Sequence, residues 1–294
     1  MNILIVGGTG FIGQALLAEI QEHHVCTVWC RNLTKVPAGC QAVTTLSALP
    51  ESASWDAVIN LAGSPIDRRW TASVKADVLN SRVEITQQLM QYLSTRSHPP
   101  QVMIQASAIG YYGSQQAEPV TESTSPHSGF THEVCKAWEQ VACDHCADAT
   151  RLVRMRLGVV LGAERALMRM SLPIQYYLGT CLGSGKQLVS WVHVHDVIRV
   201  ITRALEDPQM EGVYNVTAPE PVSHQALNQI IAKQLNRPLW FKLPEWGVRL
   251  LFGEMGEVLL LDSQSVRPQR LLDLGFSFEY PTADQAVRSI LPHL

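Results

Sequence analysis

The sequence predicts an α/β protein with a doubly wound parallel sheet and a smaller C-terminal α/β lobe. Three observations support this prediction: short apolar runs typical of buried strands, helical patterns that alternate with them, and a change of pattern near residue 161. Parallel strands are buried on both faces, and alternation of strands with helices is typical of such sheets. The chain of 294 residues exceeds the usual size of one compact domain. We therefore expect one large domain with a smaller companion, or one domain with extensive insertions. Two lobes would have a cleft between them.

The expected elements alternate along the chain. A strand at residues 3–6 and a helix at 11–20 form the first unit. Further strands are expected at 26–30, 57–61, 102–106 and 152–161, and helices near 73–95 and 132–147. Right-handed crossovers would join these strands into one parallel sheet. In the C-terminal part we expect a loop at 179–185, a strand at 213–216, and helices at 197–206, 224–235 and 244–252.

The composition argues against several classes of protein. Hydrophobic residues make up 46% of the chain and charged residues 17%, and the net charge is -3 with scattered Lys and Arg. A globular protein without a basic stripe is not expected to bind nucleic acid. No apolar run approaches the roughly 18 residues that cross a bilayer, and no signal peptide is recognised, so no membrane association is expected. Seven cysteines, an odd number, fit reduced thiols in the cytoplasm.

Two spacings resemble metal sites, but we predict no metal. Cys143 and Cys146 lie within an apolar helical pattern, and no second cysteine pair follows at a suitable distance. His193 and His195 alternate along an expected strand and would share a face. We interpret the neighbouring Asp196 as the cap of the next helix.

The strongest motif is a glycine-rich loop between the first strand and the first helix. Gly7 permits a tight turn, Gly10 lets backbone N–H groups approach a pyrophosphate, and Gly13 lets the helix pack closely on the strand. The expected strand before it and helix after it are the context that this motif requires. It predicts a Rossmann-type dinucleotide site, formed by Gly7, Thr9, Gly10, Phe11, Ile12 and Gly13.

The residue that follows the second strand predicts the choice of cofactor. Arg31 stands there with no acidic residue beside it. An acidic side chain would bind the ribose 2′-hydroxyl, whereas arginine accommodates a 2′-phosphate. We therefore predict NADP(H) rather than NAD, the alternative being a solvated arginine. The segment Asn60 to Gly63 ends the strand expected at 57–61, and its small residues would let the backbone at Leu61, Ala62 and Gly63 lie against the cofactor ribose.

These assignments divide the chain. Residues 1–160 are predicted to form the NADP-binding domain, with about residues 187–217 returning to it. Residues 161–294 would form the smaller substrate lobe. Gly183 and Gly185, together with Arg267 and Arg270, would then face the interlobe cleft and suit an anionic group. The alternative is a solvated loop with salt bridges.

The chain resembles the extended short-chain dehydrogenase/reductase superfamily, in its nucleotide-sugar epimerase branch. The motifs occur in the family's order: Gly7 to Gly13, Asn60 to Gly63, Ser107 to Gly113, Arg156 to Gly162, Gly183 to Gln187 and Trp191 to Asp196. More narrowly, it resembles an epimerase-like subfamily that includes bacterial YfcH-type proteins and a human short-chain reductase-like homologue. The cues are Arg69-Trp70, Ser81-Arg82, Gly110 to Gly113, Trp138-Glu139, Arg156 to Leu161, and Val266 to Arg270 before Leu274-Gly275-Phe276.

The resemblance implies further cofactor contacts. They fall on Arg31, on Leu61 and Ala62, on one helix at Asp77 and Arg82, and near Val160. Asp77 and Arg82 lie about 140° apart around a helix axis, so they could flank one edge of a ligand. The alternative is that they form a surface ion pair.

The superfamily's catalytic pair, Tyr-x-x-x-Lys, is missing. Alignment on Trp138-Glu139 puts Thr131 in place of the tyrosine and Cys135 in place of the lysine. A threonine hydroxyl ionises about five pKa units above a phenol, a gap of roughly 7 kcal/mol. Ser107 and Tyr112 remain weak catalytic candidates, although Ser107 stands one residue early and could point away.

Two other side chains are conceivable acids, Tyr111 and His132, for which we also expect ordinary structural roles in loop packing and on the surface of a helix start. Two functions therefore remain open. One is a reductase or epimerase that uses NADP(H) on a small carbonyl or nucleotide-sugar-like substrate. The other is a non-catalytic NADP(H)-binding protein with a regulatory or redox-sensing role.

Overall fold

The computed structural model describes residues 1–114, 119–164 and 166–291. At the centre of this described part lies a seven-stranded sheet in the order β11-β6-β5-β4-β1-β2-β3. All of its strand pairs are parallel, which confirms the predicted fold class. Its strands are β1 (Asn2–Val6), β2 (Val25–Trp29), β3 (Gln41–Val43), β4 (Ala57–Asn60), β5 (Val102–Ala108), β6 (Arg151–Leu157) and β11 (Gly212–Val216).

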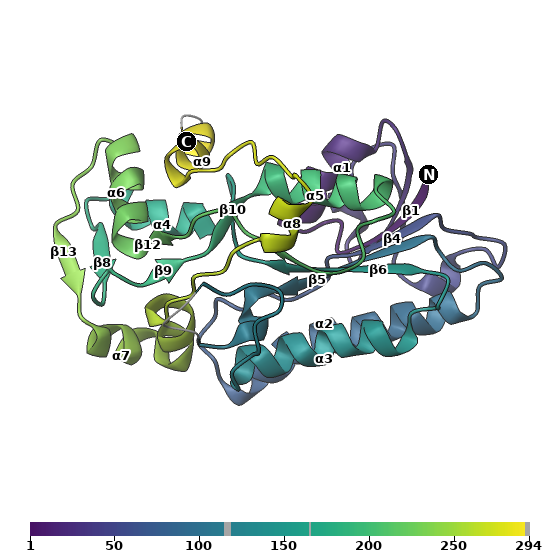
Figure 1. The fold of residues 1–294 in the computed structure, drawn as a ribbon, viewed down its shortest axis with the longest axis horizontal. Coiled ribbons are helices and arrows are strands. Elements are labelled where there is room, and N and C mark those ends of the chain that lie inside the picture. Colours follow the sequence, from purple (N-terminus) through teal and green to yellow (C-terminus); the bar gives the residue numbers. More distant parts are fainter. Residues whose placement is uncertain (115–118, 165, 292–294) are drawn as a thin grey trace.

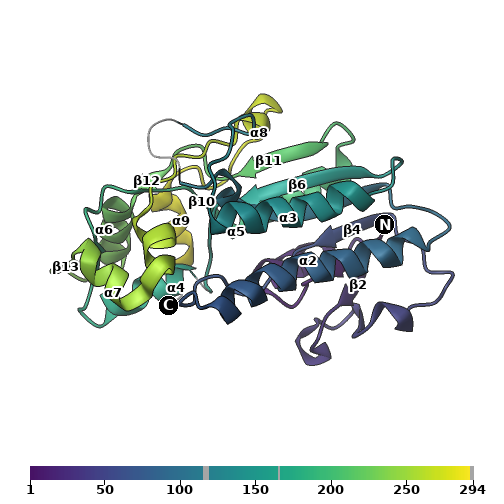
Figure 2. The same ribbon diagram turned by 90° about the horizontal axis from the view of Figure 1, so that it is seen from below.

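Helices cover both faces of the sheet (Figures 1 and 2). On one face α1 (Phe11–Ile20) packs beside α5 (Val194–Glu206), and on the other α2 (Ala72–Ser94) packs beside α3 (Phe130–His145). The strand β1 explains this arrangement, because Ile3 and Ile5 enter the core under α1 and α5, whereas Leu4 and Val6 enter the core under α2. Successive side chains of a strand point to opposite faces of the sheet. A continuous apolar run therefore supplies apolar side chains to the cores on both faces.

The C-terminal lobe lies at the left of both views and is built from small units (Figures 1 and 2). Two-stranded sheets pair β7 (Val159–Leu161) with β10 (Trp191–His193), β8 (Thr180–Leu182) with β13 (Phe241–Leu243), and β9 (Leu188–Val189) with β12 (Val222–Ser223). The helices are α4 (Ala166–Gln175), α6 (His224–Gln234), α7 (Glu245–Gly256) and α9 (Ala283–Ile290). The short α8 (Gln269–Asp273) packs on β11, and single helical turns lie at Leu33–Lys35, Leu46–Ala48, Ile109–Tyr112 and Glu257–Leu261.

Several expected elements differ from those observed. The strand expected at 152–161 is divided at Gly158, where a Cβ atom would lie 2.7 Å from the carbonyl oxygen of Ser190. The chain leaves the central sheet there, and β7 pairs with β10 instead. Residues 180–182, expected as loop, form β8 by pairing with β13, and β3 was not predicted. The helix expected from residue 197 already begins at Val194.

The interpretation of Asp196 as a helix cap was wrong. His193 caps α5, because its Nδ1 accepts a hydrogen bond from the amide of His195 at 3.1 Å. Asp196 is fully buried, and its carboxylate accepts hydrogen bonds from the amides of Glu279 and Tyr280 at 2.8 and 3.0 Å. It thereby fastens the C-terminal segment to α5. His193 and His195 do not share a strand face, since β10 ends at His193.

His193 should make folding sensitive to mild acid. Burial lowers its pKa from 6.5 to about 4, so between these values the unfolded chain binds more protons than the folded one. Stability is therefore complete above pH 6.5 and falls as the pH drops toward 4, by up to about 3 kcal/mol. We expect the H193N variant, which retains a capping side chain, to lose less stability than the wild type between pH 7 and 4.5 in urea denaturation.

The control for this prediction is the H98Q variant. His98 is exposed in the loop between α2 and β5. This variant should keep the wild-type dependence on pH. Equal slopes for the wild type and H193N would contradict the prediction.

Candidate functional site

At Gly7 and Gly13 the glycine-rich loop leaves no room for a side chain. Gly7 has a φ of +79°, and a Cβ atom there would lie 2.8 Å from the carbonyl carbon of Leu61. At Gly13 a Cβ atom would lie 2.5 Å from the carbonyl oxygen of Gly7. Gly10 stands at the N-cap of α1 and provides no capping side chain. The first N–H groups of a helix lack partners within the helix and attract anions, so α1 presents a ready anion site.

The second predicted segment meets this loop at the carboxyl edge of the sheet. Leu61 follows β4, and its backbone amide donates a hydrogen bond to the carbonyl oxygen of Val6 at 2.9 Å. The backbone amide of Ala62 donates a hydrogen bond to the side-chain oxygen of Asn60 at 3.2 Å. This bond fixes the turn that follows β4. The strand order reverses direction at β1 and β4, and ligands of doubly wound sheets bind at such a switch point. The structure therefore brings together the Gly7–Gly13 loop and the segment 61–63.

Phe11 and the β7 strand meet on the other side of the loop. A Cβ atom at Gly162 would lie 2.2 Å from the Phe11 ring, so the ring covers the end of β7. Val160 is the central residue of that strand and is partly buried. Thr9 and Ile12 lie in the loop and the first turn of α1 and are also partly buried. The predicted cofactor residues of these two segments are thus neighbours.

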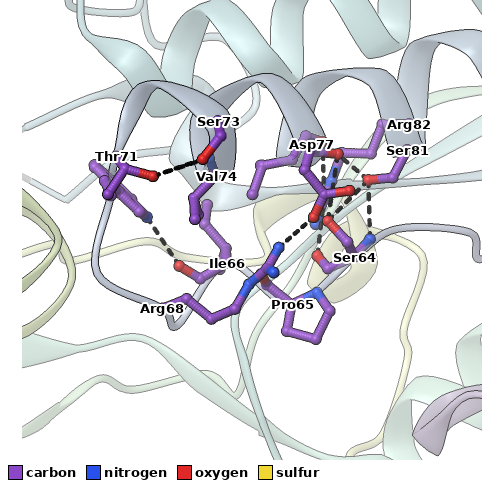
Figure 3. Close-up of polar contacts among 12 residues, drawn as sticks. Ser64, Pro65, Ile66, Arg68, Thr71, Ser73, Val74, Asp77, Ser81 and Arg82 are labelled. Carbon is purple, nitrogen blue, oxygen red and sulfur yellow. Dashed lines mark hydrogen bonds and ion pairs between the residues drawn. The ribbon is translucent and has the colours of Figure 1, made fainter.

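Asp77 and Arg82 of α2 do not pair with each other (Figure 3). Arg82 is largely buried, and its Nη1 donates to the carbonyls of Ser64 and Val78 at 3.1 and 2.9 Å. Its guanidinium also lies against Gly63, where a Cβ atom would be 3.0 Å from Cζ. Asp77 is half-exposed and pairs with Arg68, which the sequence did not point to. The alternative interpretation, an ion pair between Asp77 and Arg82, was therefore wrong, because Asp77 pairs with Arg68 and Arg82 donates to backbone carbonyls.

Arg31 is exposed just beyond β2, and within the described residues it forms no ion pair. The pKa of the Asp77 carboxyl lies below its usual value, chiefly through the hydrogen bond from Arg68 and also through the charge of Arg31. Arg68, in the loop that follows residues 61–63, and Asp77 of α2 therefore form a half-exposed ion pair.

The positions of the missing catalytic pair are filled by tight packing. Thr131 and Cys135 are buried on α3 and face the turn that follows β5. A Cβ atom at Gly110 would lie 3.0 Å from the Cβ of Thr131 and 3.7 Å from the Sγ of Cys135. This turn therefore lies directly on the helix at both positions. Burial raises the pKa of the Cys135 thiol to about 11, which keeps it neutral and unreactive.

Ser107 and Tyr112 belong to a buried polar network. The Ser107 hydroxyl donates to Glu139 at 2.7 Å, and Arg156 binds both oxygens of Glu139 at 2.9 Å. Arg156 also donates to the Tyr112 hydroxyl at 3.0 Å, which in turn donates to Asn215 at 2.7 Å. Ser107 is 2% exposed and Tyr112 is fully buried, and burial raises the pKa of Tyr112. The geometry argues against proton transfer to a substrate by either group.

The remaining predicted side chains have structural roles. The Tyr111 ring lies over Arg156, 3.3 Å from Cζ to the ring centre, as expected for loop packing. His132 is buried rather than on the surface, with Nδ1 against the carbonyl of Tyr111. Arg270 does not face a cleft, because it donates to the carbonyls of Glu211 and Val213 along the sheet edge.

The segment 67–70, between β4 and α2, contacts the C-terminal lobe. Asp67 pairs with Arg169 of α4, and Arg69 donates to the carbonyls of Leu250 and Leu251 in α7 at 3.5 and 3.4 Å. Lys75 at the start of α2 pairs with Glu254 of α7 at 2.7 Å. The loop that follows the candidate cofactor segment is therefore held by both lobes.

The part of the chain that the structure describes contains neither a candidate metal site nor a candidate membrane-spanning helix. In ranges 1–114, 119–164 and 166–291, no group of three or more His, Cys, Asp or Glu side chains could hold a metal ion. Among the same residues, no helix is both long and apolar enough to cross a membrane.

The fold and the glycine-rich loop define a dinucleotide-binding α/β protein of the Rossmann type. The particular family follows from comparison with known sequences. The family model described as the NAD dependent epimerase/dehydratase family matches residues 3–217, and the chain belongs to this family. A second model, described as a domain of unknown function (DUF1731), matches residues 243–290.

The similarity to known proteins extends over nearly the whole chain. The chloroplastic SDR39U1 homolog of Arabidopsis thaliana, an epimerase family protein, is 34% identical over 303 residues, covering 99% of this chain and 87% of that protein. The epimerase family protein YfhF of Bacillus subtilis is 34% identical over 301 residues, covering 99% and 98%. The crystal structure of human epimerase family protein SDR39U1 (isoform 2) with NADPH shares 32% identity, covers 100% of both chains and has a TM-score of 0.90.

Proposed function

We propose that the chain binds NADP(H) across the carboxyl edge of the central sheet, with the pyrophosphate at the N-terminus of α1. The observation that carries the proposal is the uncapped start of α1 at Gly10, enclosed by the close contact between Gly7 and Leu61. The human relative with 32% identity was crystallised with NADPH, which supports this choice of cofactor. The proposed contacts are Gly7, Thr9, Gly10, Phe11, Ile12, Gly13, Arg31, Leu61, Ala62, Gly63, Asp77, Arg82 and Val160.

The same proposal includes the predicted division of the chain. Residues 1–160, with about 187–217, would form the NADP-binding domain, and 161–294 the substrate lobe. The pairing of β11 with β6 supports the return of the later segment. The narrower assignment to the YfcH-type subfamily also remains a proposal, supported by Arg69-Trp70 and Trp138-Glu139.

NADPH should raise the thermal unfolding temperature of the protein. A ligand at 100 times its Kd stabilises the folded state by about 2.7 kcal/mol, which corresponds to roughly 5 °C for a chain of this size. Differential scanning fluorimetry with NADPH, NADH and no cofactor measures this. An unchanged melting curve at millimolar NADPH, together with unchanged NADPH fluorescence, would rule out the proposed function.

We infer that any activity would act on a small carbonyl or nucleotide-sugar-like substrate. It would be that of a reductase, to which NADPH supplies the hydride, or of an epimerase, in which NADP⁺ would take a hydride from the substrate and return it. A second function, NADP(H)-dependent regulation or redox sensing, is favoured by the packing of Gly110 onto Thr131 and Cys135. Two assays distinguish the two functions: oxidation of NADPH with a panel of aldehydes and ketones, and product analysis of nucleotide sugars incubated with protein and NADP⁺, because an epimerase consumes no cofactor. Turnover above background supports the first, and cofactor-dependent capture of a partner without turnover supports the second.

A further inference from the structure

We propose that the end of the C-terminal lobe is the contact surface of a homodimer, in which a second copy of this chain covers an exposed patch of aromatic side chains. We call this surface the aromatic patch, and its residues are Tyr176, Tyr177, Leu178, Trp240, Phe241 and Trp246. Figures 1 and 2 show β13, which contributes Phe241, at the end of the molecule remote from the central sheet. The inference goes beyond the proposed cofactor function and does not depend on it.

Large apolar side chains are exposed to an unusual degree in the aromatic patch. The exposed fractions are 74% for Trp240, 70% for Tyr176, 69% for Trp246, 59% for Leu178, 56% for Tyr177 and 52% for Phe241. Folding usually buries tryptophan and phenylalanine, and a continuous exposed apolar patch is typical of an interaction surface. The patch therefore favours a partner that shields it from water.

Contacts around β8 and β13 join the first two segments of the patch. The backbone amide of Phe241 donates a hydrogen bond to the carbonyl oxygen of Gly179, the residue after Leu178, at 3.3 Å. The Arg237 guanidinium lies over the Tyr177 ring, with 4.5 Å between Cζ and the ring centre. Segment 176–178 therefore lies next to the chain that enters β13.

Helix α7 continues the apolar surface beyond β13. It begins at Glu245, so Trp246 lies in its first turn. Leu250 follows one turn later with 67% of its surface exposed, and residues four apart share a helix face. Leu172 in the last turn of α4 is 50% exposed, and its carbonyl accepts a hydrogen bond from the amide of Tyr176 at 3.3 Å. The apolar surface thus extends from the aromatic patch along both helices.

The area of the aromatic patch suits a stable dimer. An aromatic side chain buries about 150–250 Å² when it is covered, so the five aromatic side chains at their observed exposures offer roughly 600 Å². The largest apolar patch on a typical monomer covers only about 300–600 Å². A stable interface buries about 800 Å² on each partner, a value that the aromatic side chains approach together with Leu172, Leu178 and Leu250.

The charges near the patch favour a second copy over a lipid surface. Residues 237–257 contain three basic and three acidic side chains, and Arg249 of α7 lies between Glu245 and Glu257 at 3.4 and 3.3 Å. Surfaces that bind lipid are usually rich in Lys and Arg on their polar side. An apolar patch with balanced charges can instead match its own copy across a twofold axis.

The edge strand β13 favours a closed dimer over an open-ended sheet. Among the described residues, β13 pairs with β8 alone. Lys242 stands at the centre of this three-residue strand and is exposed. Lysine on an edge strand opposes the pairing of edges between molecules. The two copies would therefore meet through the side chains of the aromatic patch rather than through a shared sheet.

Sedimentation velocity of the full chain from about 1 to 100 µM tests the proposal. The wild type should form a species of twice the 32.6 kDa chain mass. The W240E and W246E variants should each raise the dissociation constant of the dimer at least about 30-fold, because buried tryptophans dominate interface energies. L272E is the matched control, since Leu272 is also an exposed apolar residue but lies on α8, outside the patch.

Three outcomes would overturn the proposal. One is a wild-type chain that stays monomeric over this range, and another is a dimer that W240E and W246E leave intact, because a different surface would then hold it. The third is a monomeric wild type that cosediments with phosphatidylcholine vesicles while W240E does not, which would assign the patch to a lipid surface. Thermal unfolding of each variant verifies that the fold is retained.

Discussion

The E139A variant is expected to lose about 3–5 kcal/mol of unfolding free energy, the cost of removing one partner from a buried ion pair. Glu139 and Arg156 each expose only 4% of the side chain. Without the carboxylate, the Arg156 guanidinium would remain buried and uncompensated, and the Ser107 hydroxyl would lose its acceptor. The network joins α3, β5 and β6, so the loss affects the centre of the fold.

Urea denaturation of E139A and of a matched surface variant, D284A, measures this effect. Asp284 pairs with Arg288 in an exposed position, and such pairs contribute about 0–1 kcal/mol. The double variant E139L/R156M should be less destabilised than the sum of the single changes, because the fully buried Arg156 charge is removed together with its partner. Arg154, the second partner of Glu139 at 3.5 Å, is 25% exposed and keeps access to water. Equal destabilisation in E139A and D284A would show that the buried pair contributes no more than a surface pair.

The main elements of the fold could be predicted because their signal is periodic. Strands such as β1 and β4 are continuous apolar runs, and helices such as α2 carry a long helical pattern. Elements of three residues, such as β3 and β8, carry no such signal. They become strands only through pairing with partners elsewhere in the chain. The division of one expected strand at Gly158 likewise depends on contact with Ser190.

The candidate site was predictable only where it follows the sheet. The carboxyl ends of parallel strands share one edge, which is why the loop at Gly7 and the segment at Leu61 were expected together. Arg68 could not be found in this way, because its loop is positioned by α4 and α7, whose residues come about a hundred or more positions later. Ser107 shows the same limit, since only the structure reveals that it points to Glu139.

The G10A variant is expected to retain its fold and lose NADPH binding. A Cβ atom at Gly10 would meet only the carbonyl oxygen of Gly7, at 3.2 Å, and the φ of -81° suits alanine. The methyl group would, however, project at the helix N-terminus where the pyrophosphate is proposed to lie. The loss of several hydrogen bonds to a charged ligand predicts a Kd at least about 100-fold higher.

The G13A variant provides the contrast. Its Cβ atom would lie 2.5 Å from the Gly7 carbonyl oxygen and 2.6 Å from the Gly8 Cα atom, an overlap that forces α1 away from the loop and costs about 1–3 kcal/mol or more. Stability and NADPH binding should therefore fall together in G13A but separate in G10A. E19A, in the exposed last turn of α1, should change neither. Normal NADPH binding by G10A would show that the cofactor does not lie over the start of α1, because a methyl group there would then obstruct nothing.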